Sequence, residues 1–177
     1  PRVAAAEGGA LKAVRDLGIN VVEMTKGSNA LAVHCDDMAV EVNDAALRLI
    51  ARIGPQVVWL NLAKTRVSDA GLAILAQFPE LRRLHLDRTG IADAGLAHVA
   101  KLTKLEYLNL YKTKVSDAGL RQLTKMPTLK KIYAGQTRVT EAGAAQLMAS
   151  KPELEINAGF IAIPTETPQP GASGTIV

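Results

Sequence analysis

TRVSDAGL, at residues 65–72, reads like the start of a helix, but the same phrase returns three times along the chain. The later copies are TGIADAGL at 89–96, TKVSDAGL at 113–120 and TRVTEAGA at 137–144, and each begins 24 residues after the one before. A fixed period of this length is typical of repeat proteins, in which one unit cannot bury its apolar side alone. Several copies are therefore needed, because stacked units share one continuous core.

The units aligned on this phrase occupy residues 57–80, 81–104, 105–128 and 129–153, with the consensus LxxLxLxxTxVxDAGLxxLxxxPx. We number the places of each unit from 1, so that Val57 stands at place 1 and Leu60 at place 4. Leucines at places 1, 4 and 6 are spaced as a short strand requires, and the later apolar pair is spaced i, i+3 as a helix requires. Each unit is predicted to contain one strand, one turn and one short helix.

The repeated phrase is the joint between the strand and the helix. Thr65 is predicted to end the strand and Val67 to point into the core. Ser68 or Asp69 can accept hydrogen bonds from the first free N–H groups of the helix, and an acid also suits the helix dipole there. Gly71 adds no bulk, which predicts that consecutive helices stack closely.

These residues resemble the leucine-rich repeat family over residues 57–153. The resemblance implies an α/β solenoid with a curved parallel β-sheet on its concave face and short helices on its convex face. The phrase TxVxDAGLxxL is similar to bacterial repeat arrays that are sometimes joined to c-type cytochrome-like domains. That context implies a periplasmic or other extracytoplasmic location, but the chain has no CxxCH, so no haem site carries over.

Residues 1–56 are predicted to form an N-terminal α/β cap that carries one degenerate repeat. A helix is expected at 4–17, two strand-like stretches follow at 19–24 and 30–34, and VNDAALRLIARI at 42–53 echoes the repeat phrase. Matching Leu31 and Val33 to Leu60 and Leu62 leaves about four extra residues in the loop of this degenerate repeat.

The four regular repeats and a short last strand, LEINAG at 154–159, are predicted to fill residues 57–159. Residues 160–177 have the Pro/Gly/Thr-rich composition of a linker. Because the chain opens on PRVAAAEGGA without an initiator Met, we expect it to be a piece of something longer, such as a subunit or domain of a multiprotein assembly.

Composition excludes several classes of protein. With 48% hydrophobic and 21% charged residues, the 177-residue chain has the balance of a soluble globular domain. A net charge of +4 is too small to imply nucleic acid unless it is concentrated on one face. No apolar run approaches the roughly 20 residues of a membrane span. The single cysteine, Cys35, excludes an internal disulfide and a cysteine-based zinc site.

No catalytic motif is present: the sequence lacks GxSxG, HExxH, a P-loop, GxGxxG and paired CxxC. His34 and Cys35 are neighbours on a predicted strand and so point to opposite faces, which prevents a nucleophile–base pair. Cys35 is predicted to be a small core or loop residue. Asp36, Asp37 and Glu41 lack calcium-loop spacing and are predicted to form a solvated acidic loop. We therefore predict no enzyme activity, no metal and no cofactor.

The strand positions that point away from the core carry a distinctive set of side chains. Aromatic rings there either form a binding surface or reflect ordinary cross-strand packing, since aromatics favour strands. Solvent-facing rings beside Arg and His favour the binding surface. The candidate binding residues at places 3, 5 and 7 are Trp59, Asn61, Arg83, His85, Tyr107, Asn109, Tyr111, Lys131 and Tyr133, with Ala63, Asp87 and Gly135 completing these places.

A basic ridge is predicted beside this face, formed by Lys64, Arg88 and Lys112 at place 8. Neighbouring strands lie roughly 4.8 Å apart, so these cations should repel one another unless they are neutralised. The cations at place 10 can find local acids three residues later, whereas the ridge has no such regular partner. The pairs expected at place 10 are Arg66 with Asp69, Lys114 with Asp117 and Arg138 with Glu141; Asp93 follows Gly90 instead.

The sequence thus favours a non-catalytic scaffold that binds a protein with an acidic patch through its concave face. A carbohydrate or cell-surface binding module, including one for an anionic polysaccharide, is the first alternative. A docking domain of a larger cytochrome-linked redox protein is the second. Nucleic acid is not expected, because one short ridge falls short of a groove that tracks a backbone.

Overall fold

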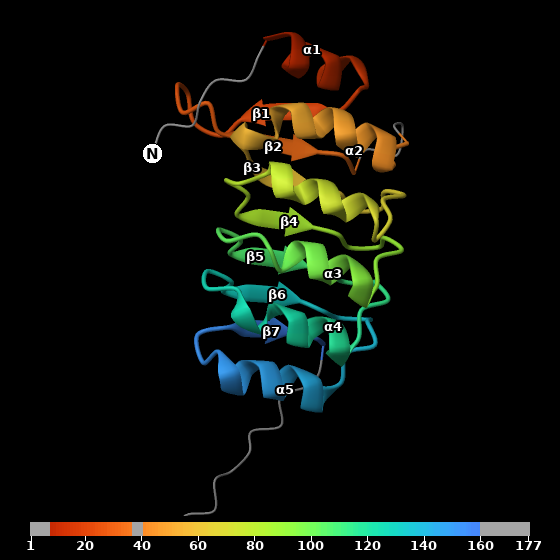
Figure 1. Ribbon diagram of the computed structural model, residues 1–177, viewed down its shortest axis with the longest axis vertical. Helices are drawn as coiled ribbons and strands as arrows, with labels where there is room; N and C mark the ends of the chain where they lie inside the picture. Colours follow the sequence, from red (N-terminus) through yellow and green to blue (C-terminus); the bar gives the residue numbers. More distant parts are fainter. Residues whose placement is uncertain (1–7, 37–40, 160–177) are drawn as a thin grey trace, which may run out of the picture.

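The computed structural model describes residues 8–36 and 41–159 (Figure 1). Its strands form one seven-stranded sheet in chain order. These strands are β1 (Asn20–Glu23), β2 (Leu31–His34), β3 (Val57–Asn61), β4 (Arg83–His85), β5 (Tyr107–Asn109), β6 (Lys131–Tyr133) and β7 (Glu155–Asn157).

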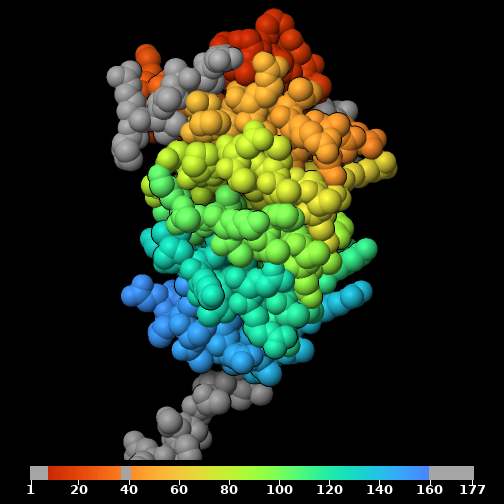
Figure 2. Space-filling model, in the orientation of Figure 1, coloured from red at the N-terminus to blue at the C-terminus, as the bar shows by residue number. Residues whose placement is uncertain are grey.

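Helical segments stack beside one another along one face of this sheet, in the same order as the strands (Figure 1). On the surface, the colours follow one another in layers in chain order (Figure 2). The α-helices are α1 (Gly8–Asp16), α2 (Asp44–Ile50), α3 (Asp93–Val99), α4 (Asp117–Gln122) and α5 (Glu141–Ser150). Three 3-10 segments are η1 (Ala51–Gln56), η2 (Gly71–Gln77) and η3 (Leu123–Lys125), so the first regular repeat carries a 3-10 rather than an α-helix. No helix in the described part of the chain is long and apolar enough to cross a membrane.

The strands of the regular repeats pair in parallel and in the register that the 24-residue period predicts. Leu60 pairs with Leu84, Leu84 with Leu108, and Leu108 with Ile132. All four side chains are fully buried. The core places were therefore predicted correctly, because only one register keeps every aliphatic side chain on the helix side of the sheet.

The expectation of a purely parallel sheet is wrong at the N-terminal end. Strand β1 pairs antiparallel with β2, with Val21 opposite Val33. The reason is the short connection between the two strands, since a parallel pair needs a crossover of a dozen or more residues. Gly27 and Asn29 in this connection have φ values of 79° and 56°, as tight turns often require.

The predicted match of the degenerate repeat is also wrong, by two residues. Val33, and not Leu31, pairs with Leu60. The N–H of Cys35 donates to the carbonyl of Asn61, as the N–H of Leu62 donates to that of His85, so Cys35 takes place 6. Counted to Asn43, the equivalent of Ser68, the connection is two residues longer than in a regular repeat, and not about four.

The aspartate of the repeat phrase joins one unit to the next. Asp93 accepts two hydrogen bonds from Ser116, one from the N–H at 2.7 Å and one from the hydroxyl at 2.6 Å. Asp117 does the same to Thr140, at 2.8 and 2.7 Å. The hydroxyls of Ser116 and Thr140 in turn accept an N–H from the helix that follows each of them. The expectation that serine caps its own helix is confirmed, whereas the aspartate binds the next unit instead.

The glycine of the phrase makes room for that aspartate. A Cβ added to Gly143 would lie 2.1 Å from the Cγ and Oδ1 atoms of Asp117, and one added to Gly119 would lie 2.4 Å from Asp93 Oδ1. Such distances are far inside van der Waals contact. The close stacking expected from small residues therefore has a specific cause, because each glycine receives the carboxylate of the preceding unit.

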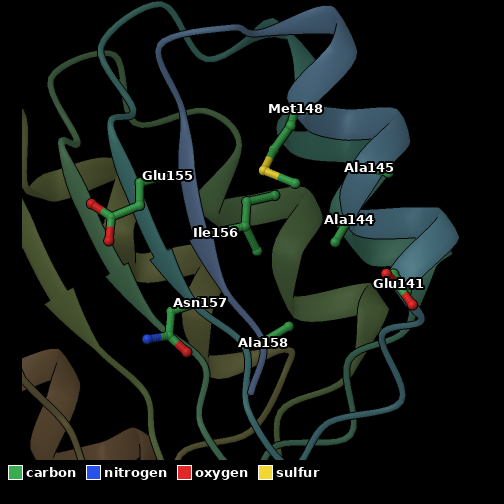
Figure 3. A pocket seen from close by; sticks show the side chains of 8 residues that line it. All are labelled: Glu141, Ala144, Ala145, Met148, Glu155, Ile156, Asn157 and Ala158. Atoms are coloured by element: carbon green, nitrogen blue, oxygen red, sulfur yellow. The ribbon is translucent and has the colours of Figure 1, made fainter. Parts of the chain in front are cut away.

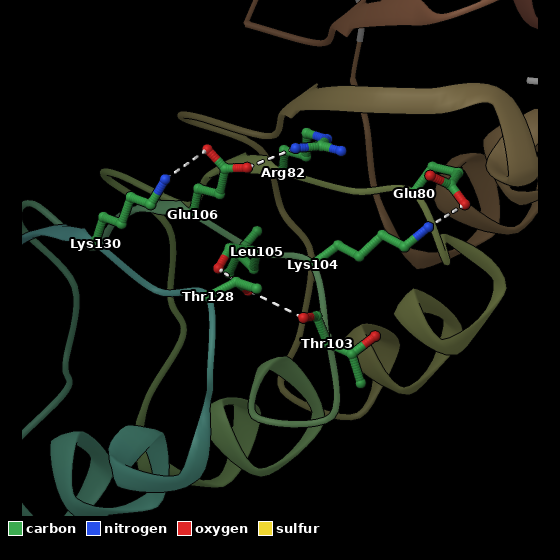
Figure 4. A network of polar contacts seen from close by, with 8 residues as sticks. All are labelled: Glu80, Arg82, Thr103, Lys104, Leu105, Glu106, Thr128 and Lys130. Carbon is green, nitrogen blue, oxygen red and sulfur yellow. Dashed lines mark hydrogen bonds and ion pairs between the residues drawn. The ribbon is translucent and has the colours of Figure 1, made fainter. Parts of the chain in front are cut away.

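Ion pairs and hydroxyl hydrogen bonds link neighbouring units just before the N-terminal ends of their strands (Figure 4). Glu106 receives Arg82 at 2.6 Å and Lys130 at 3.8 Å, each from an adjacent unit. The hydroxyl of Thr128 donates to the carbonyls of Thr103 and Leu105. Because the ion-paired side chains are substantially exposed, each pair contributes about 0–1 kcal/mol to stability.

Candidate functional site

The sheet face opposite the helices, called the open face below, carries two rows of side chains. Place 3 of successive units brings Trp59, Arg83, Tyr107 and Lys131 into one row, and place 5 brings Asn61, His85, Asn109 and Tyr133 into the next. Both rows follow from strand alternation, since places 3 and 5 flank the buried place 4. The structure therefore brings these eight predicted residues together on one surface.

The rings on this face form a continuous zigzag between the two rows. Their order is His34, Trp59, His85, Tyr107 and Tyr133, and successive ring centroids lie 5.2, 5.9, 5.0 and 5.5 Å apart. Each contact runs diagonally from one strand to the next. These spacings are typical of favourable aromatic pairs. We call this set the aromatic zigzag.

Cations lie against the zigzag. The guanidinium of Arg83 is 5.6 Å from the Trp59 ring centroid, and the ammonium of Lys131 is 5.2 Å from that of Tyr133. Lys131 also pairs with Glu155 at 2.8 Å, and these contacts raise its pKa, with the Glu155 hydrogen bond as the largest cause. Arg83 is exposed and forms no salt bridge with the described residues. Its charge is available to a partner.

His85 occupies the middle of the zigzag as a neutral ring. Burial lowers the pKa of its imidazole below the ordinary 6.5, and Asp87, whose Oδ1 is 3.7 Å from Nδ1, only partly opposes that shift. Burial also raises the pKa of the neighbouring Tyr107 phenol. Both rings are therefore uncharged at neutral pH, and the charged side chains near them include Arg83, Lys131, Glu155 and Asp87.

Asn61 and Asn109, predicted as binding residues, hold the turn that follows their strands. The Oδ1 atom of Asn61 accepts the N–H of Ala63, and that of Asn109 accepts the N–H of Tyr111, both at 3.0 Å. Asn109 also donates to Asp87 at 3.1 Å. Their amide oxygens are thus occupied by the fold. Ala63, at place 7, is buried and offers no surface.

The basic ridge of Lys64, Arg88 and Lys112 has an unusual backbone. The three residues have φ values of 61°, 58° and 57°, in the left-handed region. A side chain there is less favourable than glycine by about 1 kcal/mol. All three are exposed, and no described acid forms a salt bridge with them. Arg88 lies over the ring of Tyr111, 6.0 Å from its centroid.

The acids expected to pair with the cations at place 10 do not pair as predicted. Asp69 and Asp117 accept hydrogen bonds from the next unit, from Ala92 and Thr140. Arg66 instead pairs with Glu41, at 2.9 Å. For Lys114 and Arg138 the structure shows no salt bridge within its described residues. The reason is geometric, because each carboxylate points along the stack toward the following glycine.

The other residues that the sequence singled out for chemistry include Cys35 and Asp37. Cys35 is buried, as predicted, and burial raises the pKa of its thiol to about 12. Asp37 lies outside the described residues. Among the residues that are described, no group of three or more His, Cys, Asp or Glu side chains could hold a metal ion.

The chain is similar to internalin C2 from Listeria monocytogenes str. 4b F2365, a leucine-rich repeat protein of solved structure. The two share 25% sequence identity with a TM-score of 0.50, over 64% of this chain and 49% of internalin C2. The chain thus spans about half of the length of that protein. No protein-family model and no curated protein matches the sequence.

The likeness to internalin C2 supports a leucine-rich-repeat-like α/β repeat fold. It does not reach the finer 24-residue bacterial type, and the division into cap, repeats and tail stays a prediction. Sequence reasoning missed His34 as a member of the open face. The signal was present, since matching Val33 and Cys35 to places 4 and 6 would have put His34 at place 5.

Proposed function

We propose that this chain is a non-catalytic interaction module that binds another protein through its open face, the predicted concave face. The observation that carries the proposal is the aromatic zigzag with Arg83 beside it. Half-buried rings and arginine are the residue types that contribute most of the binding energy at protein interfaces. The likeness to internalin C2 supports an interaction scaffold of this general kind.

The partner is proposed to present an acidic patch. Arg83 and the basic ridge place positive charge at and beside the zigzag without a described acid to neutralise it. Exposed charges of this kind mainly steer association, while buried rings determine how long the complex lasts. The proposal therefore assigns different kinetic roles to the two groups of residues.

A protein partner suits the rings better than a sugar does. Trp59 and His85 stack with an interplanar angle of 26°, and the following pairs are tilted by 33° and 43°. Their faces are thus partly turned toward one another, which leaves ring edges for a partner. Specific binding of the purified chain to glycans on an array would favour the carbohydrate module instead.

The test uses two arginines on opposite faces. Arg83 lies on the open face and Arg121 is exposed on α4, on the helix side. Proteins captured from the native organism by the wild-type chain are measured by surface plasmon resonance against Arg83→Ala, Tyr107→Ala and Arg121→Ala. We expect the first two to weaken binding by about 1–4 kcal/mol. Arg121→Ala, which removes the same charge, should bind like the wild type; the reverse pattern would move the site to the helices.

The ridge is tested by substitutions that preserve its backbone. Asparagine tolerates the left-handed region, so Lys64→Asn, Arg88→Asn and Lys112→Asn together remove three charges with little strain. We expect slower association and a weaker salt dependence, with the dissociation rate nearly unchanged. An unchanged association rate at low salt would exclude the ridge from steering.

A further inference from the structure

The last described unit, formed by α5 and β7, has on its outer side the surface that inner units use to contact the next repeat. Each internal interface joins three things: two parallel strands, a row of aliphatic side chains, and an acid that binds the next unit. At α5 and β7 one half of each is present. Glu141 stands where Asp117 stands one unit earlier, and Ile156 continues the buried row through Ile132. No described strand pairs with the outer edge of β7.

The result is an apolar groove between α5 and β7 (Figure 3). Met148 and Ile156 point into it from opposite sides, and Ala144 and Ala158 line its length. Its volume is about 370 Å³. Met148 is 37% exposed, which places it among the few large apolar side chains of the described residues that solvent reaches. An exposed apolar groove of this kind marks a docking surface.

The sequence that follows the last described residue begins with an apolar segment, which suits an apolar groove. In the sequence, Phe160, Ile161, Ala162 and Ile163 begin two residues after Ala158, which lines the groove. They precede PTETPQPGASGTIV, whose composition is that of a linker. These residues lie outside the described part, so the inference rests on their sequence and on where they begin. A segment tethered this closely has an effective concentration on the order of millimolar at the groove.

We propose that Phe160–Ile163 bind in the groove between α5 and β7, so that the chain covers the open end of its own core. This proposal is independent of the function of the open face. It explains why four consecutive apolar residues introduce an otherwise polar and proline-rich stretch. It also leaves the aromatic zigzag uncovered, because the groove opens between α5 and β7 at the end of the stack.

The two phenylalanines of the chain make a direct test possible. Labelling the full-length protein with 4-fluorophenylalanine gives two fluorine signals, one from Phe78 and one from Phe160. Phe78 is fully buried and serves as the internal reference. We expect the Phe160 signal to be displaced from that of the free amino acid and to show a reduced H₂O/D₂O isotope shift, as a shielded ring does.

Substitutions in the groove then identify the site. Met148→Gln should return the Phe160 signal to the position and isotope shift of the free amino acid, while the Phe78 signal stays in place. Leu49→Gln is the matched control, because Leu49 is 38% exposed on α2, far along the stack. A free-like Phe160 signal in the wild type would overturn the proposal. So would shielding that disappears on dilution, which would identify a second copy as the occupant.

Discussion

The Asp117 carboxylate occupies the space that a side chain at Gly143 would fill. A double-mutant cycle on these two residues can therefore test why the repeat phrase contains both an aspartate and a glycine. Asp117→Ala removes two hydrogen bonds to Thr140, of 2.8 and 2.7 Å. Because Thr140 is exposed, water replaces part of that loss, and we expect a destabilisation of about 1–2 kcal/mol. The same two hydrogen bonds lower the pKa of Asp117 below 3.8. Its contribution is therefore complete above pH 3.8, is lost as the pH falls through the lowered pKa, and is best measured at pH 7.

The effect of Gly143→Ala on the free energy of unfolding should have opposite signs in the wild type and in the Asp117→Ala variant. In the wild type the new methyl group would lie 2.1 Å from the Asp117 carboxylate, so the carboxylate must leave and its hydrogen bonds are lost. We expect a destabilisation of about 1–3 kcal/mol. In the Asp117→Ala background the three nearest atoms are gone. Alanine should then stabilise the helix by about 0.5–1 kcal/mol relative to glycine.

The assay is urea unfolding followed by circular dichroism, with constant m-values as the check on two-state behaviour. The cycle should give a coupling energy of about 1.5–4 kcal/mol between the two sites, the difference between the two effects of Gly143→Ala. Gly90→Ala is the control, because nothing lies within 4 Å of its added Cβ. It should have the same effect in both backgrounds. If Gly143→Ala destabilises both backgrounds equally, the carboxylate is not the reason for the glycine.

Three further predictions test the core and its buried groups. Leu108→Ala, in the centre of the buried row, should destabilise the protein by about 2–5 kcal/mol through the cavity it leaves; an almost unchanged melting temperature would contradict the register. Because burial lowers the pKa of His85 below 6.5, the unfolded chain binds its proton more readily. Stability should therefore fall as the pH drops below 6.5, and His85→Gln should lessen that slope in urea titrations at pH 7.5 and 5.0. Since the pKa of Cys35 is raised to about 12, iodoacetamide at pH 8 should alkylate it slowly in native protein and quickly in urea; fast native alkylation would place the thiol outside the core.

The sequence predicted the regular repeats well because burial constrains them. Leu60, Leu84 and Leu108 had one possible register, given strand alternation and a 24-residue period. The degenerate repeat had two possible registers, because two pairs of residues have the spacing of places 4 and 6. One pair is Leu31 and Val33, and the other is Val33 and Cys35. Counting only aliphatic residues favoured the wrong one. Cysteine is among the most buried residue types, and treating it as a core residue would have given the right match.

Contacts between units were harder to predict than the elements within them. Asp69 was expected to act within its own helix start, because capping is a local rule. Its carboxylate instead accepts a hydrogen bond from the N–H of Ala92, in the next unit. The aromatic zigzag was not predicted for the same reason, because it also depends on contacts between units. The sequence places Trp59 and His85 in different rows, and their ring centroids come within 5.9 Å of each other only because the rings lean diagonally across neighbouring strands.

The difference between places whose side chains hold the fold together and places whose side chains do not supports the proposed site. Most places in the phrase have a structural duty: the hydroxyl of Thr113, for example, donates to the carbonyl of Leu110, and Gly119 receives the carboxylate of Asp93. Among the described residues, the side chains at place 8 and those of Arg83 and Tyr107 at place 3 form no such hydrogen bond, whereas Lys131 at place 3 pairs with Glu155. At place 8 the backbone favours glycine or asparagine, yet the residues there are the three long cations of the ridge and, in the fourth repeat, the uncharged Gln136. The fold alone would not select such side chains at that conformation, and a strained position kept by an unfavourable residue type is a reason to expect function there. We therefore expect substitutions at places 3 and 8 to change binding more than stability, and substitutions at places 13 and 15 to do the reverse.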